Sequence, residues 1–103
     1  MTDRKSGVEI TEQTVVRAAQ SQVSTVLDGE AVLLELSRGV YFGLNEVGTR
    51  VWEMVREPRD VASIRDAVCD EYDVTPGQCL VDMVDLLERM HREGLVEVID
   101  GTR

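Results

Sequence analysis

The sequence has little of what metal centres and redox sites require. It contains two cysteines and one histidine in 103 residues. Cys69 and Cys79 do not form a Cys-x-x-Cys pair, and His91 cannot complete a four-ligand zinc site with them. The acidic stretch at residues 70–73 lacks the spacing and the glycine of an EF-hand loop. We therefore expect no metal and no other cofactor, and two reduced thiols in or near the core.

Recognisable catalytic motifs and long apolar runs are missing as well. The sequence has no nucleophile–base set and no phosphate-binding loop, so we expect a protein that is not an enzyme. His91 is interpreted as a structural histidine. No apolar run approaches the ~18 residues of a membrane span. Residues 1–7 are polar and charged, unlike a signal peptide. The expected location is the cytoplasm.

Basic residues are also scarce. Lys and Arg number 11 against 20 Asp and Glu, which gives a formal charge of −9. This balance argues against binding to nucleic acid or anionic membranes, both of which need clustered cations. It favours a basic or neutral partner. The hydrophobic content of 43% is enough for the core of one domain.

The first half of the chain predicts an antiparallel sheet of three strands, at residues 23–27, 31–36 and 40–44. Asp28-Gly29 between the first two strands is a strong hairpin signal. The middle run is the most apolar, as expected for a central strand. The third strand then lies at an edge with unpaired backbone groups, and Gly43 leaves room there for another backbone.

The second half predicts three helices and a final strand. The helices are expected at residues 46–55, 61–72 and 76–93, each after a capping residue, and the strand at 95–99. The predicted fold class is α+β, with an N-terminal three-stranded antiparallel sheet followed by a three-helix winged helix-turn-helix. Residues 1–20 are expected to be flexible or partly ordered, and residues 21–103 to form the domain.

The third helix has an apolar arc of about 160°, whereas about 100° suffices to bury one face. Its predicted centre is formed by Leu80, Val84, Leu87 and His91. Met83, Met90, Cys79 and Leu86 fall on one flank. Two interpretations remain open: a well-buried helix, or a core face beside a second apolar surface that suits a peptide. On the third strand, Val40, Phe42 and Leu44 share one face, which is expected to belong to the core. Which face of this strand lines the peptide groove is left open.

Five segments, taken in order, carry a resemblance to a known family. They are residues 39–48 (GVYFGLNEVG), 51–52 (VW), 72–74 (YDV), 82–87 (DMVDLL) and 94–96 (GLV). This ordered set, within residues 22–99, resembles the PqqD-like family, the precursor-peptide recognition element of ribosomal peptide pathways. The resemblance implies that a precursor leader lies between the third strand and the third helix and extends the sheet by one strand.

The site expected from this resemblance and from the helix flank comprises Val40, Tyr41, Phe42, Gly43, Leu44, Cys79, Asp82, Met83, Leu86, Arg89 and Met90. We expect a stand-alone member of this family, and among those the chain is most similar to the lasso-peptide type. That type implies a cysteine protease that removes the leader and a macrolactam synthetase as partners. A carrier of the precursor of pyrroloquinoline quinone is the related alternative.

A winged-helix DNA-binding regulator is the alternative from another class. Residues 66–100 hold ten Asp or Glu and two Arg. The helix that would enter the major groove is acidic, so phosphates would repel it. The sequence therefore favours a peptide partner over DNA.

Overall fold

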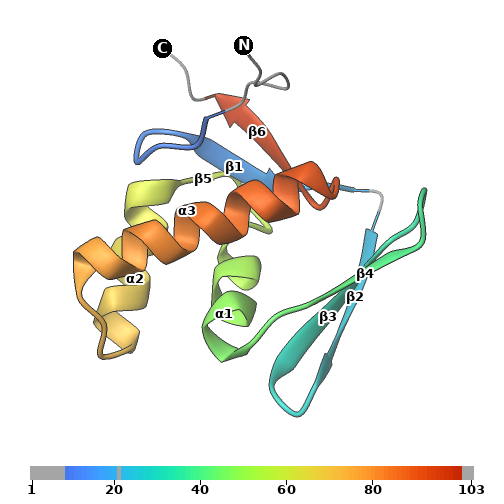
Figure 1. Ribbon diagram of the computed structural model, residues 1–103, viewed down its shortest axis with the longest axis horizontal. Coiled ribbons are helices and arrows are strands. Elements are labelled where there is room, and N and C mark those ends of the chain that lie inside the picture. The colour runs from blue at the N-terminus through green and yellow to red at the C-terminus, as the bar shows by residue number, and fades with distance from the viewer. Residues whose placement is uncertain (1–8, 21, 101–103) are drawn as a thin grey trace.

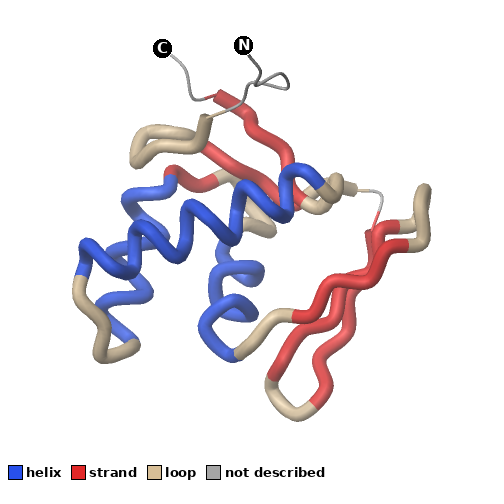
Figure 2. The backbone as a smooth tube through the Cα atoms, in the orientation of Figure 1, coloured by secondary structure: helices blue, strands red, loops and turns tan. Residues whose placement is uncertain are grey.

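The protein has an α+β fold in which three helices lie between two small antiparallel sheets (Figures 1 and 2). The structure is a computed structural model that describes residues 9–20 and 22–100. The elements in chain order are β1 (Val15–Ala18), β2 (Gln22–Leu27), β3 (Glu30–Glu35), β4 (Val40–Gly43), α1 (Glu46–Met54), β5 (Arg59–Asp60), α2 (Val61–Glu71), α3 (Pro76–Arg92) and β6 (Val96–Asp100).

The predicted three-stranded sheet is confirmed, with strand order β2-β3-β4. Asp28 and Gly29 both adopt positive φ, +55° and +81°, as the tight hairpin between β2 and β3 requires. The register places Leu33 of β3 opposite Phe42 of β4. β4 is therefore an edge strand, as expected.

A second sheet, with order β5-β1-β6, was not predicted. Its central strand β1 comes from the segment that the sequence assigned to a flexible or partly ordered start. Val16 is fully buried and Ile10 nearly so, so part of this segment packs into the core. We expected the first few residues of the chain to be disordered. They fall within residues 1–8, which lie outside the described residues.

This second sheet also changes the interpretation of the strand after α3. That strand was predicted as the wing of a winged helix-turn-helix. β6 instead pairs antiparallel with β1, Ala18 lying opposite Val96 and Val16 opposite Val98. The three predicted helices are present, but this pairing with the N-terminal segment does not confirm the winged helix-turn-helix assignment.

The helices hold the β2-β3-β4 sheet in place against the core. Thr49 of α1 accepts a hydrogen bond from the Ala31 N–H through its Oγ1, at 2.7 Å. Leu33 of β3 and Leu87 of α3 are fully buried in the same apolar cluster. Within residues 9–20 and 22–100, none of the helices combines the length and apolar character that a bilayer crossing needs.

Candidate functional site

The open edge of β4 carries hydrogen-bonding groups whose direction follows from the register. The Leu44 N–H donates to the Ala31 carbonyl at 2.9 Å. Because bonded and non-bonded pairs alternate along an antiparallel ladder, Phe42 bonds to Leu33. The N–H and C=O groups of Tyr41 and Gly43 then point away from β3. In the described chain no strand lies beyond β4, so these groups face an unoccupied edge.

The two faces of β4 differ. Phe42 lies on the face that packs toward the core. The Arg89 guanidinium of α3 lies over the Phe42 ring, with its Cζ 5.8 Å from the ring centroid, and Asp85 holds Arg89 through an ion pair of 3.3 Å. Tyr41 points to the other face and is 72% exposed. The face of β4 that carries Phe42 is therefore the one that faces α3.

A polar cluster fixes the turn before β4 to the end of α3. Arg38 Nη2 donates to the Glu93 carbonyl at 2.6 Å and to Glu93 Oε1 at 3.1 Å. The buried Glu35 carboxylate accepts from Ser37 Oγ at 2.7 Å and from the Arg38 N–H at 2.9 Å. Together with the Arg89–Phe42 contact, this cluster places β4 and α3 antiparallel.

We call the facing sides of these two elements the β4–α3 surface. Its members are Val40, Phe42, Leu86 and Arg89, with Asp82, Asp85 and Glu93 at its rim. Leu86 and Phe42 are half-buried and pack against the edge of the core. The surface thus joins an apolar strip to a charged rim beside unpaired backbone groups, a combination that suits an extended peptide.

The structure places part of the predicted site in the core, because α3 is turned about its axis relative to the prediction. Its buried residues are Cys79, Met83, Leu87 and Met90, which moves the centre of the buried face by about 75° at about 100° per residue. Cys79, Met83 and Met90 are therefore core side chains, as is Leu44 at 5% exposure. Leu86, Asp82 and Arg89 remain on the side that the prediction assigned to the peptide.

The Cys79 thiol is not activated as a nucleophile. Burial, and to a smaller extent a hydrogen bond with the Cys69 thiol, raise the pKa of Cys79 to about 11. Cys79 is therefore protonated at neutral pH, whereas a reactive cysteine must be present as the thiolate. Within the described residues, no group of three or more His, Cys, Asp or Glu side chains could hold a metal ion.

The predicted site omitted Arg38, Glu35 and Asp85. Asp85 and Arg89 are four residues apart on one helix, and this spacing by itself predicts an ion pair between them. Arg38 and Glu93 are separated by 55 positions. No local pattern could have paired them, because their contact depends on how the turn packs against the helix.

Comparisons with known proteins give a family and a similar solved structure. The family model described as coenzyme PQQ synthesis protein D (PqqD) matches residues 30–96. A solved structure, "TbiB1 in Complex with the TbiA(beta) Leader Peptide", is similar to this chain, with 36% sequence identity and a TM-score of 0.73. The similarity covers 84% of this chain and 98% of TbiB1. None of the curated proteins matches.

Proposed function

Because the chain belongs to the PqqD family, we propose that it binds the leader segment of a ribosomally made precursor peptide by adding that segment as a strand on β4. The observation that carries this proposal is the open edge of β4, where Tyr41 and Gly43 direct their backbone groups outward beside α3. TbiB1, whose structure holds a leader peptide, supports the same class of ligand.

The two parts of the site have different roles. Each backbone hydrogen bond to Tyr41 or Gly43 contributes about 0.5–1.5 kcal/mol to the binding free energy. Such bonds form with almost any peptide sequence, because they involve only main-chain groups. Contacts with Leu86 and Phe42 depend on the side chains of the peptide, so they select which leader binds. The protein acts by binding and presentation, without chemistry of its own, and its place is the cytoplasm.

The lasso-peptide pathway is the setting we propose, with the protein presenting the leader to a cysteine protease and a macrolactam synthetase. The alternative is a carrier of the precursor of pyrroloquinoline quinone. Neighbouring genes distinguish them: a short precursor gene beside a protease and a synthetase gene supports the first, and genes for quinone synthesis support the second.

Hydrogen–deuterium exchange with and without a peptide tests strand addition. The probes are the TbiA(beta) leader and the leader encoded beside this gene. We expect the amides of Tyr41 and Gly43 to exchange more slowly in the complex, because they become donors to the added strand. The amides of β6, in the other sheet, serve as the internal control and should hardly change. Protection confined to α3 or β6 contradicts strand addition.

We also expect no binding to duplex DNA at physiological salt. On α3, Asp82, Asp85 and Glu88 oppose Arg89 and Arg92, so phosphates would meet a repulsive surface. Fluorescence anisotropy with a labelled random-sequence duplex is the measurement. Sub-micromolar binding that weakens with added salt would contradict the expectation and revive the winged-helix alternative.

A further inference from the structure

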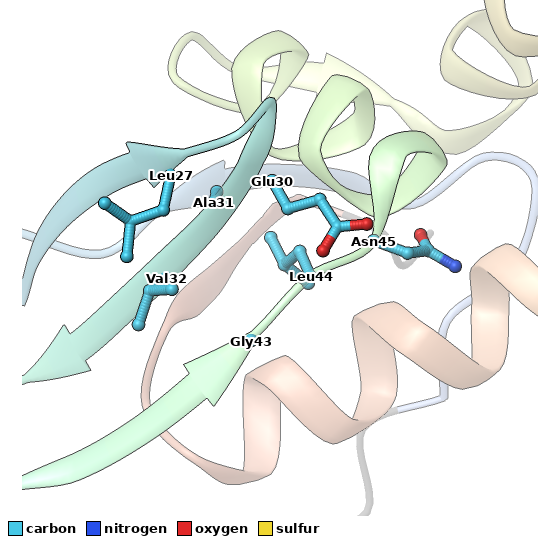
Figure 3. Close-up of a pocket in the computed structure, with 7 residues that line it drawn as sticks. All are labelled: Leu27, Glu30, Ala31, Val32, Gly43, Leu44 and Asn45. Atoms are coloured by element: carbon cyan, nitrogen blue, oxygen red, sulfur yellow. The ribbon is translucent and has the colours of Figure 1, made fainter.

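A hollow of about 330 Å³ lies at the end of β4 and is separate from the β4–α3 surface (Figure 3). Its lining comes from the β2–β3 hairpin, from β4 and from the residues that follow β4. No residue of α3 is among the described residues that line it. The lining residues are Leu27, Glu30, Ala31, Val32, Gly43, Leu44 and Asn45.

The hollow opens on the face of the sheet that points away from the core. Val32 pairs with Gly43, and Leu27 pairs with Glu30. Side chains alternate along each strand, and the intervening Ala31 and Leu33 are buried. The side chains that line the hollow on the outer face are therefore those of Leu27, Glu30 and Val32.

Gly43 leaves this hollow open toward the edge of the sheet. A Cβ built on Gly43 would meet no atom within 4 Å, and the φ of Gly43 lies outside the left-handed region. Backbone strain therefore does not require glycine here. Because Gly43 has no side chain, the outer face of β4 has a gap at this position. A side chain from a neighbouring strand can pass through this gap.

The carboxylate of Glu30 lines the hollow without an ion pair to any described residue. Glu30 is exposed, and no Lys, Arg or His of residues 9–20 and 22–100 forms an ion pair with it. Figure 3 shows its carboxyl group extended beside Leu44 toward Asn45, that is, toward the end of β4. The apolar side chains of Leu27 and Val32 line the same hollow.

We propose that this hollow receives a lysine or arginine side chain of the bound strand, with the alkyl stem crossing Gly43 to lie on Val32 and the cation pairing with Glu30. This inference rests on the proposed function. A strand added to β4 lies about 4.8 Å from it and about 10 Å from β3. Short side chains of the added strand cannot span that distance, whereas long ones reach diagonal neighbours when the intervening position is empty.

The experiment is an affinity selection from random twelve-residue peptides displayed on their own mRNA. The wild-type protein is compared with Glu30→Gln, which removes the charge, and Gly43→Leu, which fills the hollow. Glu57→Gln and Gly77→Leu are matched controls, since Glu57 is exposed outside the site and a Cβ at Gly77 also meets open space.

Wild type and both controls should enrich Lys or Arg at one fixed position, and both site variants should lose this preference. Replacing that Lys or Arg by Met in a selected peptide should weaken binding to the wild type about two- to fivefold, the range of a partly exposed ion pair. The same replacement should leave the affinity for Glu30→Gln unchanged. Thermal melts check that every variant is folded.

The outcomes separate this inference from the proposed function. Peptides that bind along β4 without a basic preference, or with the same preference in Glu30→Gln, overturn the hollow as a cation site and leave leader binding intact. If no peptide binds, or if bound peptides protect amides elsewhere than β4, the proposed function itself fails.

Discussion

Tyr41→Pro is expected to reduce leader affinity at least about tenfold while the domain remains folded. Proline removes the N–H that the added strand needs as a donor, and its ring occupies the open edge. The Tyr41 N–H points away from β3, and proline is tolerated on an edge strand at such positions. The missing hydrogen bonds, one or two in number, and the steric clash together account for this decrease in affinity, since each 1.4 kcal/mol of binding free energy changes the affinity about tenfold.

Two variants control this result, measured by titration calorimetry and thermal melts. Tyr41→Ala removes the same exposed side chain and keeps the N–H, so it should bind much better than Tyr41→Pro. Phe42→Pro should destabilise the fold, because the Phe42 N–H belongs to the ladder with Leu33. Equal affinities of Tyr41→Ala and Tyr41→Pro would show that the backbone edge is not used.

The sequence predicted the elements whose signals are local. The Asp28-Gly29 turn requires two residues with positive φ, which that dipeptide accommodates. Asn45 and Asp60 cap α1 and α2 by accepting hydrogen bonds from the N–H groups of Gly48 and Ser63. Such signals depend on a few neighbouring residues, so they survive whatever the tertiary structure is.

The features that the sequence failed to predict depend on contacts between distant segments. Four residues from Val15 to Ala18 lie among polar neighbours and form β1 only because β5 and β6 pair with both of its edges. The burial of α3 is centred on Met83, Leu87 and Met90 because three-dimensional packing selects one part of a wide apolar arc. A helical wheel gives the width of such an arc, but not which part the core covers.

The alternation of backbone groups along β4 is another feature of the binding site that the sequence alone could not fix. From the sequence, Phe42 was the expected residue whose N–H bonds to the leader, with Tyr41 as the alternative because the alternation along the strand was not fixed. The Leu44 to Ala31 hydrogen bond removes the ambiguity and assigns Tyr41 and Gly43 to the open edge. A single long-range pairing therefore decides which substitution tests binding and which tests folding.

Leu86→Asp and Met83→Asp, three positions apart on α3, are expected to have opposite consequences. Leu86 is half-buried at the edge of the core, so an aspartate there keeps part of its hydration, and we expect a loss of about 1–2 kcal/mol in the free energy of unfolding. It should nevertheless reduce leader affinity at least about tenfold, because a peptide would cover an unpaired charge. Met83 is 4% exposed. An aspartate there is buried without a partner and should cost more than about 4 kcal/mol, most of the stability of a small domain.

Val81→Asp is the matched control, since Val81 is 63% exposed on the opposite side of α3 and should change neither property. Urea denaturation gives the stabilities, and titration with the leader at a temperature where each variant is folded gives the affinities. If Leu86→Asp unfolds the domain as completely as Met83→Asp, the core extends to Leu86 and the β4–α3 surface lacks its apolar strip. If Leu86→Asp binds like Val81→Asp, the leader does not cover Leu86, and its specificity must come from elsewhere along β4.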